Sequence, residues 1–278
     1  MKRPKRLIVQ LLSFFLQNPL LGNFVTGKIY QGKLKNFCTP GLNCYSCPAA
    51  VVSCPVGAMQ LFLAGAKYSV SLFISGFLLS AGVIFGRLIC GYVCPMGLLQ
   101  DLLYKIRTPK RIVKLRFARY VKYAVLLVFV IALPLAVRHE LSGLGEPWFC
   151  KYICPSGTIF GAIPLLSANS TLLRFAGAQL VLKLSLAVAT AVSSVVIYRP
   201  FCRILCPLGA FYSLFNKAAF IKMRCDKEKC TSCGSCAKAC SIQLDPAAQP
   251  NSPECVRCGN CISACGEKAL GYGRRNML

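Results

Sequence analysis

The sequence predicts an α-helical membrane protein with about four transmembrane helices, re-entrant segments and a C-terminal soluble module. The chain has 278 residues, of which 55% are hydrophobic and only 15% charged, whereas soluble domains carry about 25% charged residues. The mean hydropathy of +0.56 agrees with a membrane protein. The 19 cysteines are far more than a core requires, and they recur at regular spacings. These patterns divide the chain into a transmembrane domain over 1–224 and a soluble domain over 225–278.

Four apolar segments are the predicted spans. Leu7–Gly27 follows a basic N-terminus and lacks a small-x-small cleavage site, so it is interpreted as an uncleaved anchor. Tyr68–Gly86, Tyr120–Val137 and Ala176–Tyr198 are each long enough to cross about 30 Å of hydrocarbon. Ala49–Leu63 is expected to form a re-entrant segment, which requires its backbone to be buried in protein.

The basic residues orient these spans. Segments 1–6, 87–119 and 199–224 carry most of the Lys and Arg residues of the transmembrane domain, so they are expected to face the cytoplasm. This predicts a multi-pass protein of the inner (cytoplasmic) membrane with both termini in the cytoplasm. The formal charge of +25 is then explained by topology and contact with anionic lipid, and nucleic acid is not an expected partner. Lys183 is expected to snorkel to the interface, the alternative being a functional buried charge.

The soluble domain carries the most specific motif, because Cys-x2-Cys-x2-Cys-x3-Cys occurs there twice. Three cysteines at every third position wrap a loop around one [4Fe–4S] cubane, and the fourth normally ligates the other cluster. The motif predicts a ferredoxin-like 2[4Fe–4S] module. The expected ligands are Cys230, Cys233, Cys236 and Cys265 for one cluster, and Cys255, Cys258, Cys261 and Cys240 for the other. Zinc is the alternative, but structural zinc sites use two separated cysteine pairs.

Two details of this domain depart from the simplest pattern. The proline that usually follows the fourth cysteine is replaced by Ser241 in one run and Gly266 in the other, which makes the shielding of the clusters less predictable. Cys225 lies outside both runs and is expected to be a bystander thiol.

The transmembrane domain carries a second motif, Cys-x3-Cys-Pro-x-Gly. It occurs at Cys90/Cys94, Cys150/Cys154 and Cys202/Cys206, and Cys54 begins a related half. Proline suits the first position of a helix, whose free N–H groups and positive dipole end then favour a thiolate at the preceding cysteine. Cys90, Cys94, Cys202 and Cys206 fall on the predicted cytoplasmic side and match the needs of one [4Fe–4S] cluster.

Six cysteines fall on the predicted outer side: Cys38, Cys44, Cys47, Cys54, Cys150 and Cys154. They exceed one four-cysteine cluster and fall short of two, so one or two further clusters are expected there. Disulfides are the alternative, because an outer compartment is oxidising. Recurrence of the Cys-Pro-x-Gly motif favours clusters.

With these motifs, the chain from Tyr68 onward resembles the membrane polyferredoxins that accompany periplasmic nitrate reductase and nitrous oxide reductase. The resemblance is carried by the pairs Cys90/Cys94 and Cys202/Cys206, the four-span layout and the C-terminal double ferredoxin. It implies anaerobic electron transfer between a cytoplasmic donor or a quinone pool and a redox partner. The outer cysteines depart from that pattern and suggest redox sites on both faces of the membrane.

The expected function is therefore iron–sulfur electron transfer through or across the membrane, as a carrier or oxidoreductase subunit. The expected donor is a cytoplasmic ferredoxin or flavodoxin, and the expected acceptor is a quinone or an outer-face redox protein. No catalytic residue is predicted, and no glycine motif for nucleotides occurs. A metal reductase or metal-cofactor assembly factor with the same clusters is one alternative, and a redox sensor is another. His139 is the only histidine, so haem held between two histidines is excluded.

Overall fold

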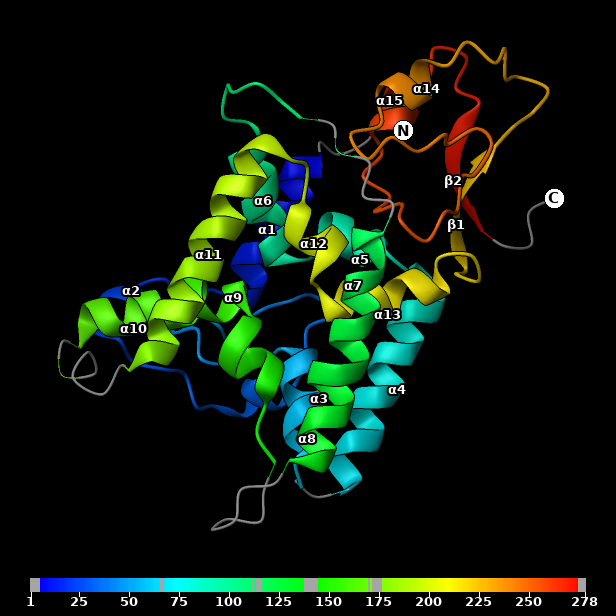
Figure 1. The fold of residues 1–278 in the computed structure, drawn as a ribbon. Helices are drawn as coiled ribbons and strands as arrows, with labels where there is room; N and C mark the ends of the chain where they lie inside the picture. The colour runs from blue at the N-terminus through cyan, green and yellow to red at the C-terminus, as the bar shows by residue number, and fades with distance from the viewer. Residues whose placement is uncertain are drawn as a thin grey trace.

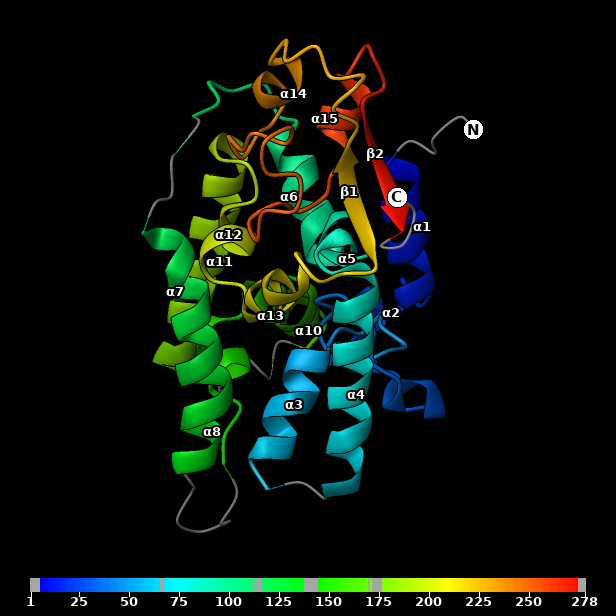
Figure 2. The same ribbon diagram turned by 90° about the vertical axis from the view of Figure 1, so that its right-hand side faces the viewer.

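The computed structural model describes residues 6–65, 68–111, 113, 117–137, 145–169, 171 and 177–274. His139 and the start of the predicted span at Ala176 lie outside these residues. In Figure 1 the C-terminal module, which contains α14, α15, β1 and β2, sits at one end of the molecule. Helices α3, α4 and α8 project from the opposite end. The same order is visible from the side in Figure 2.

The N-terminal helix α1 (Arg6–Gln17) is shorter than the predicted span Leu7–Gly27. Pro19 follows closely, and proline both lacks an N–H donor and disfavours a helical residue before it. The polar residues of α1 are buried against the protein: Gln10 Nε2 donates to the Gly91 carbonyl over 3.0 Å, and Gln17 Nε2 donates to that of Val93 over 3.0 Å. The prediction of one continuous anchor helix was therefore wrong.

Three long helical stretches form the body of the transmembrane domain. They are α4 (Tyr68–Phe85), the continuous stretch α7 (Ala118–Val125), η2 (Leu126–Ala132) and α8 (Leu133–Ala136), and α11 (Ala178–Val196). The segment η2 is a π-helix that ends two residues before Pro134. The π-helices η3 (Phe149–Ile153) and η4 (Thr158–Ala162) likewise end two residues before Pro155 and Pro164. Since proline removes an i→i−4 hydrogen bond, the wider turn lets the chain continue through it.

Two of the described helical stretches, Ala118–Ala136 and Ala178–Val196, are long and apolar enough to cross a membrane. The apolar stretches Arg6–Gln17 and Phe73–Phe85 are shorter. The four expected spans are thus matched in length and composition by two. Large apolar side chains nevertheless face outward from several helices, among them Leu79, Leu127, Val188 and Val192.

Short helices bring the Cys-Pro motifs to the centre of the bundle. Each of α3 (Pro55–Leu63), α6 (Pro95–Tyr104), α9 (Pro155–Gly157) and α13 (Pro207–Phe215) begins at a proline that follows a cysteine. The helices α5 (Leu88–Tyr92) and α12 (Pro200–Ile204) carry the first cysteines of two motifs. The chain over 49–54, before α3, is irregular and mostly buried in protein, as a re-entrant segment requires. Peripheral segments are α2 (Asn23–Thr26), η1 (Lys33–Asn36) and α10 (Ile163–Ala168).

The C-terminal module is held by an antiparallel pair of strands, β1 (Ile221–Cys225) and β2 (Leu270–Arg274), with Cys225 opposite Leu270. Two single-turn helices, α14 (Ser235–Lys238) and α15 (Asn260–Ser263), complete it. Strand β1 begins four residues before the boundary expected at Cys225.

The module docks on the bundle through buried polar contacts. The buried Lys122 Nζ of α7 donates to Glu254 over 2.7 Å, so Lys122 does not reach the interface as a snorkelling residue would. The fully buried Arg257 extends from the module toward the bundle, where it donates to the carbonyls of Phe85 over 3.0 Å and Asn216 over 2.6 Å. Buried charges that lose such partners are costly, so these contacts fix the module in place.

The closest approach between the module and the bundle is at Gly91 of α5. A Cβ atom at Gly91 would lie 2.7 Å from the Val256 carbonyl oxygen, which is backbone and cannot move aside alone. We expect Gly91→Ala to destabilise the docked module by about 1–3 kcal/mol, as overpacking does. The measurement is the rate at which a protease releases the module from the full chain in detergent.

Gly76→Ala in α4 is the matched control, because no atom lies within 4 Å of its Cβ position. Alanine there should leave protease release unchanged, since it replaces glycine within a helix without a clash. Equal release rates for Gly91→Ala and Gly76→Ala would contradict the docking described above.

Candidate metal centres

Four cysteines from two Cys-Pro motifs converge beneath the module. They are Cys90 of α5, Cys94 before α6, Cys202 of α12 and Cys206 before α13, here called the inner thiol set. All four are buried in the main apolar core, and each interacts electrostatically with others of the set. Cysteines of two motifs that are far apart in the chain therefore lie near one another.

Each Cys-Pro-x-Gly motif directs a backbone N–H at its own sulfur. The Gly209 N–H donates to Cys206 Sγ over 3.3 Å. The N–H groups of Gly57, Gly97 and Gly157 are directed in the same way at Cys54, Cys94 and Cys154. A Cβ at Gly97 would lie 2.9 Å from the Cys90 carbonyl oxygen, so a side chain at this position would disturb the packing of the Gly97 backbone against Cys90. Such N–H groups stabilise negative charge on sulfur, whether thiolate or cluster-bound.

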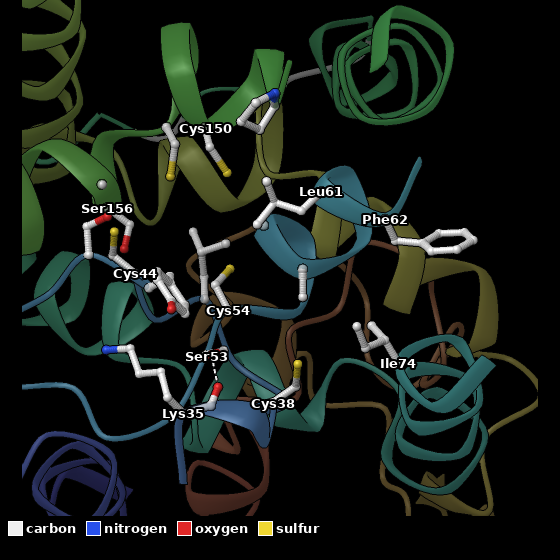
Figure 3. Close-up of a pocket in the computed structure, with 18 of the residues that line it drawn as sticks. Lys35, Cys38, Cys44, Ser53, Cys54, Leu61, Phe62, Ile74, Cys150 and Ser156 are labelled. Carbon is white, nitrogen blue, oxygen red and sulfur yellow. Dashed lines mark hydrogen bonds between the residues drawn. The ribbon is translucent and has the colours of Figure 1, made fainter. Parts of the chain in front are cut away.

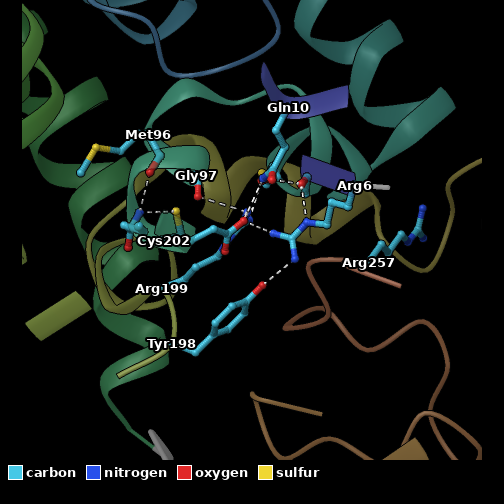
Figure 4. Close-up of polar contacts among 12 residues, drawn as sticks. Arg6, Gln10, Met96, Gly97, Tyr198, Arg199, Cys202 and Arg257 are labelled. Atoms are coloured by element: carbon cyan, nitrogen blue, oxygen red, sulfur yellow. Dashed lines mark hydrogen bonds and ion pairs between the residues drawn. The ribbon is translucent and has the colours of Figure 1, made fainter. Parts of the chain in front are cut away.

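Two fully buried arginines hold the inner thiol set from opposite sides. The Arg199 guanidinium donates to the Cys90 carbonyl over 2.6 Å and to the Gly97 carbonyl over 3.3 Å (Figure 4). The Arg87 guanidinium donates to the Cys202 carbonyl over 3.2 Å. Each arginine stands three residues before the first cysteine of its own motif and binds the backbone of the other motif. Two buried positive charges thus flank the thiols.

Asp101 balances one of these charges. Arg199 Nε and Nη2 donate to its two carboxylate oxygens over 2.8 and 2.5 Å. Arg6 of α1 pairs with the same carboxylate, and Gln10 donates to it over 2.8 Å (Figure 4). The network joins α1, α6 and the turn before α12 around the inner thiol set.

A glutamine six residues after a cysteine donates to a sulfur at two places. Gln100 Nε2, six residues after Cys94, donates to Cys202 Sγ over 3.0 Å. Gln60 Nε2, six residues after Cys54, donates to Cys150 Sγ over 3.3 Å. Both glutamines are fully buried. The repeated unit is therefore Cys-Pro-x-Gly-x-x-Gln, and in each case the glutamine donates a hydrogen bond to a cysteine of another Cys-Pro motif.

A second set of four thiols lines a cavity of about 980 Å³. This cavity thiol set consists of Cys44, Cys54, Cys150 and Cys154, which interact electrostatically with one another (Figure 3). Cys38 also lines the cavity, on the far side of Cys54 near Ile74 (Figure 3), whereas Cys47 does not line it. All six cysteines on the predicted outer side are free thiols, so no disulfide joins them.

Lys183 of α11 also lines this cavity and acts electrostatically on Cys44 and Cys150. Its place at the cavity favours a functional charge over a side chain that snorkels to the membrane interface. An ammonium beside a group of thiols gains by facing their negative charge, which is the alternative that the sequence left open.

The two sets of thiols in the bundle are linked by one buried tyrosine. The Tyr212 hydroxyl donates to the Pro40 carbonyl over 2.9 Å, and Tyr212 interacts electrostatically with thiols of both sets, namely Cys90, Cys94, Cys206 and Cys54. In the loop after Pro40, the Leu42 N–H donates to Cys94 Sγ over 3.4 Å, while the Leu42 side chain lines the cavity. The inner and cavity thiol sets are thus separated by little more than Tyr212 and Leu42.

In the module the cysteines form two further groups. The proximal thiol set, which lies nearer the bundle, consists of Cys240, Cys255, Cys258 and Cys261, and its members interact with one another. The second motif run supplies three of them and the first run supplies Cys240. The distal thiol set, by the motif, consists of Cys230, Cys233, Cys236 and Cys265.

The distal thiol set differs from its motif in one respect. Cys225 at the end of β1 forms a hydrogen bond with Cys230 and lies near Cys236 and Cys265, and burial raises its pKa. Cys233 is exposed, and hydrogen bonds from the Ser235 side chain and backbone lower its pKa, which favours the thiolate. Cys225 is thus in contact with this set and is not the bystander that the sequence suggested.

The spacing of these thiols suits a cluster better than a single ion. In the part of the chain that the structure describes, no three His, Cys, Asp or Glu side chains lie close enough to hold one metal ion. One zinc would draw thiolates to about 2.3 Å from itself, and so to about 4 Å from one another. A [4Fe–4S] cubane takes one thiolate at each of four separate irons, so it accepts thiolates that lie farther apart than those around one zinc. Free thiols, directed N–H groups and buried arginines all fit that group.

Removal of one buried arginine tests this arrangement. Arg199→Met leaves Asp101 and the carbonyls of Cys90 and Gly97 without their main donor, so we expect a loss of about 3–5 kcal/mol in unfolding free energy. Arg199→Lys should lose a smaller part of the unfolding free energy, because lysine keeps the positive charge but lacks the planar guanidinium group with its several N–H donors. Equilibrium unfolding of the detergent-solubilised protein measures both.

The exposed pair between Lys229 and Asp226, 3.0 Å apart, provides the control. Lys229→Met should change the unfolding free energy by less than about 1 kcal/mol. If Arg199→Met were no more destabilising than Lys229→Met, the network around Asp101 would not stabilise the fold.

Comparison with known proteins agrees with these sites. The profile of the family described as "4Fe-4S binding domain" matches residues 68–114, 123–168 and 181–225, each of which contains one complete Cys-x3-Cys-Pro motif. The chain is 30% identical to the uncharacterized protein MJ0750 of Methanocaldococcus jannaschii, over 58% of this chain and 61% of that protein. It therefore spans less than two thirds of that relative's length. No solved structure matches.

Two further relatives carry a descriptive name, methylamine utilization ferredoxin-type protein MauN. The chain is 26% identical to MauN of Methylorubrum extorquens, over 57% of this chain and 49% of that protein. It is also 26% identical to MauN of Methylobacillus flagellatus, over 67% of this chain and 60% of that protein. The chain therefore contains ferredoxin-type 4Fe-4S binding domains and is homologous to the MauN ferredoxin-type proteins.

Proposed function

We propose that this protein carries electrons across the inner membrane along four [4Fe–4S] clusters. The distal, proximal, inner and cavity thiol sets each hold one cluster, so the residues of each set are its ligands. The carrying observation is that the proximal set packs on the inner set at Gly91, and that Tyr212 interacts with thiols of both the inner and the cavity sets. Such a series has no gap that would require haem, which a chain with His139 alone could not hold between two histidines.

The first contacts in this series lie between the module and the bundle. The Val256 carbonyl, beside Cys255 of the proximal set, packs on Gly91, beside Cys90 of the inner set. Tyr198 interacts electrostatically with Cys258 of the proximal set and, through its hydroxyl, accepts a hydrogen bond from Arg6 over 3.1 Å. Tyr212 then connects the inner and cavity sets.

The donor side of the proposal rests on the surface of the module. Cys233 of the distal set is exposed, and the lysines at 227, 229 and 238 around it are also exposed. A small acidic carrier such as a ferredoxin or flavodoxin is the class of partner that this positive surface would steer toward an exposed cluster edge.

The acceptor side rests on the cavity. Beyond its thiols the cavity is lined by Phe37, Leu61, Phe62, Phe73 and Ile74, so its mouth between α3 and α4 is apolar (Figure 3). A quinone would suit this lining, because ligand sites are largely apolar with a few polar groups that fix orientation. An outer-face redox protein is the other acceptor consistent with transfer across the membrane.

Membrane insertion belongs to the same proposal. Two helical stretches, Ala118–Ala136 and Ala178–Val196, are long and apolar enough to span a membrane, and α4 also belongs to the bundle. The outward-facing apolar side chains of these helices would contact lipid. By the positive-inside rule, the basic residues of segments 87–119 and 199–224 support a cytoplasmic location for the module and both termini.

Transfer across sealed vesicles tests the function. With a reductant on the cytoplasmic side only, a membrane-impermeant acceptor on the outer side should be reduced. Replacement of Cys150 and Cys154 by serine should abolish this transfer and leave the clusters of the module reducible, because only the last cluster loses its ligands.

Cys47→Ser is the matched control, since Cys47 lies on the same predicted side but does not line the cavity. Its Sγ lies 3.7 Å from Asn18 Oδ1, a contact that a serine hydroxyl can keep. Transfer should survive in Cys47→Ser. Transfer that survives in the Cys150/Cys154 variant would overturn the transmembrane route and favour a quinone oxidoreductase confined to the inner face.

A further inference from the structure

A fifth thiol, Cys225, lies beside three of the four cysteines that the motif assigns to the distal cluster site, namely Cys230, Cys236 and Cys265. Cys225 ends β1, and with Cys236 and Cys265 it packs against the small core formed around Met223 and Leu270. Its sulfur is within hydrogen-bonding distance of Cys230. Backbone pairing with Leu270 fixes the position of Cys225, so its approach to the site is set by the sheet and not by a loop.

Cys233 is the least enclosed of the five. It lies in a loop between Ser232 and Gly234, both of which have positive φ angles of 54° and 71°. Its Sγ lies 3.4 Å from the Ser235 hydroxyl, and its side chain is exposed. An exposed cysteine is the ligand that oxidants and alkylating agents reach first.

We propose that Cys225 is a reserve ligand of the distal cluster, which binds the iron of Cys233 when the Cys233 thiolate is lost. This inference rests on the proposed function, because it assumes a [4Fe–4S] cluster at the distal set. The exchange is not a redox step: the bond from iron to Cys233 sulfur breaks, the Cys225 thiol gives its proton to solvent, and a bond from iron to Cys225 sulfur forms.

The proximal set offers the comparison within the same module. The main electrostatic interactions of Cys255 and Cys261 with other cysteines are all with members of the proximal set. The two halves of the module share one motif but differ in that Cys225 interacts with the distal set. Loss of one ligand should therefore have different consequences in the two clusters.

The experiment measures iron and acid-labile sulfide per full-length chain, purified without oxygen in detergent. The variants are Cys233→Ala, Cys225→Ala, the double variant of both, and Cys258→Ala. Alanine is chosen because a serine oxygen could itself bind iron. We expect wild-type iron content in both Cys233→Ala and Cys225→Ala, and a loss of about four irons in the double variant and in Cys258→Ala.

Alkylation gives a second readout that does not depend on iron content. Iodoacetamide, applied without oxygen to native Cys233→Ala, should leave Cys225 unmodified while the cluster is present and should modify it once a chelator has removed the iron, as mass spectrometry of its peptide would show. If Cys233→Ala loses about four irons, or if the double variant keeps them, the proposal that Cys225 is a reserve ligand is wrong. If Cys258→Ala also keeps the wild-type iron content, the proposed cluster ligands of the module are wrong instead.

Discussion

Buried negative charge is the constraint on which the bundle depends. Four thiolates, or the anionic cluster that they hold, cannot be enclosed in an apolar core without compensating charge and hydrogen bonds. Arg87 and Arg199 supply the charge, and each binds the backbone of the opposite Cys-Pro motif. Neither motif can therefore form its half of the site without the other, which ties the helices after Arg87 to those after Arg199.

Other polar residues of the domain follow from this constraint. Asp101 is needed because a buried arginine requires a partner, and Arg6 and Gln10 complete the coordination of its carboxylate. Helix α1 therefore packs its polar residues toward the bundle, although it begins a run that looks like a membrane anchor. Glu254 has the same role beside Arg87 and Lys122, and it brings the module onto the inner thiol set.

The cavity site lacks this reciprocity. Pro147 stands where the inner motifs have arginine, three residues before the first cysteine, and Cys54 has no cysteine four residues earlier. Cys44 supplies the fourth thiol from irregular chain, and Lys183 and Lys35 supply positive charge at the cavity wall. A site with fewer fixed partners leaves more open volume, and the proposed acceptor would approach the proposed last cluster through this volume.

The sequence predicted what short spacings determine. The two cysteine groups of the module and the pairing of two Cys-Pro motifs were predicted from ligand geometry. In the structure Cys206 interacts with Cys90, Cys94 and Cys202, and Cys261 interacts with Cys240, Cys255 and Cys258. The sequence could not show that Cys44, rather than Cys38, interacts with the other three thiols of the cavity set, because both stand in irregular chain without a repeated motif. Cys225 was missed because its contact with Cys230 arises from the pairing of β1 with β2.

The arginines and glutamines that contact the cysteine motifs also occur at regular spacings, from which their roles could have been predicted. Arginine occurs three residues before the first cysteine in both inner motifs, and glutamine occurs six residues after Cys54 and Cys94. An apolar run alone does not reveal that its few polar residues face protein, which is why Leu7–Gly27 looked like a span and Lys183 looked like an interfacial residue.

Iron and acid-labile sulfide per chain, together with electron paramagnetic resonance of the reduced protein, test the central claim most directly. Four clusters in contact require about 16 irons and about 16 sulfides per chain. Neighbouring reduced clusters should also broaden or split one another's spectra, and the part of this effect that involves the cavity cluster should disappear without Cys150 and Cys154. A content of about eight irons, with the spectrum of the module alone, would contradict the account.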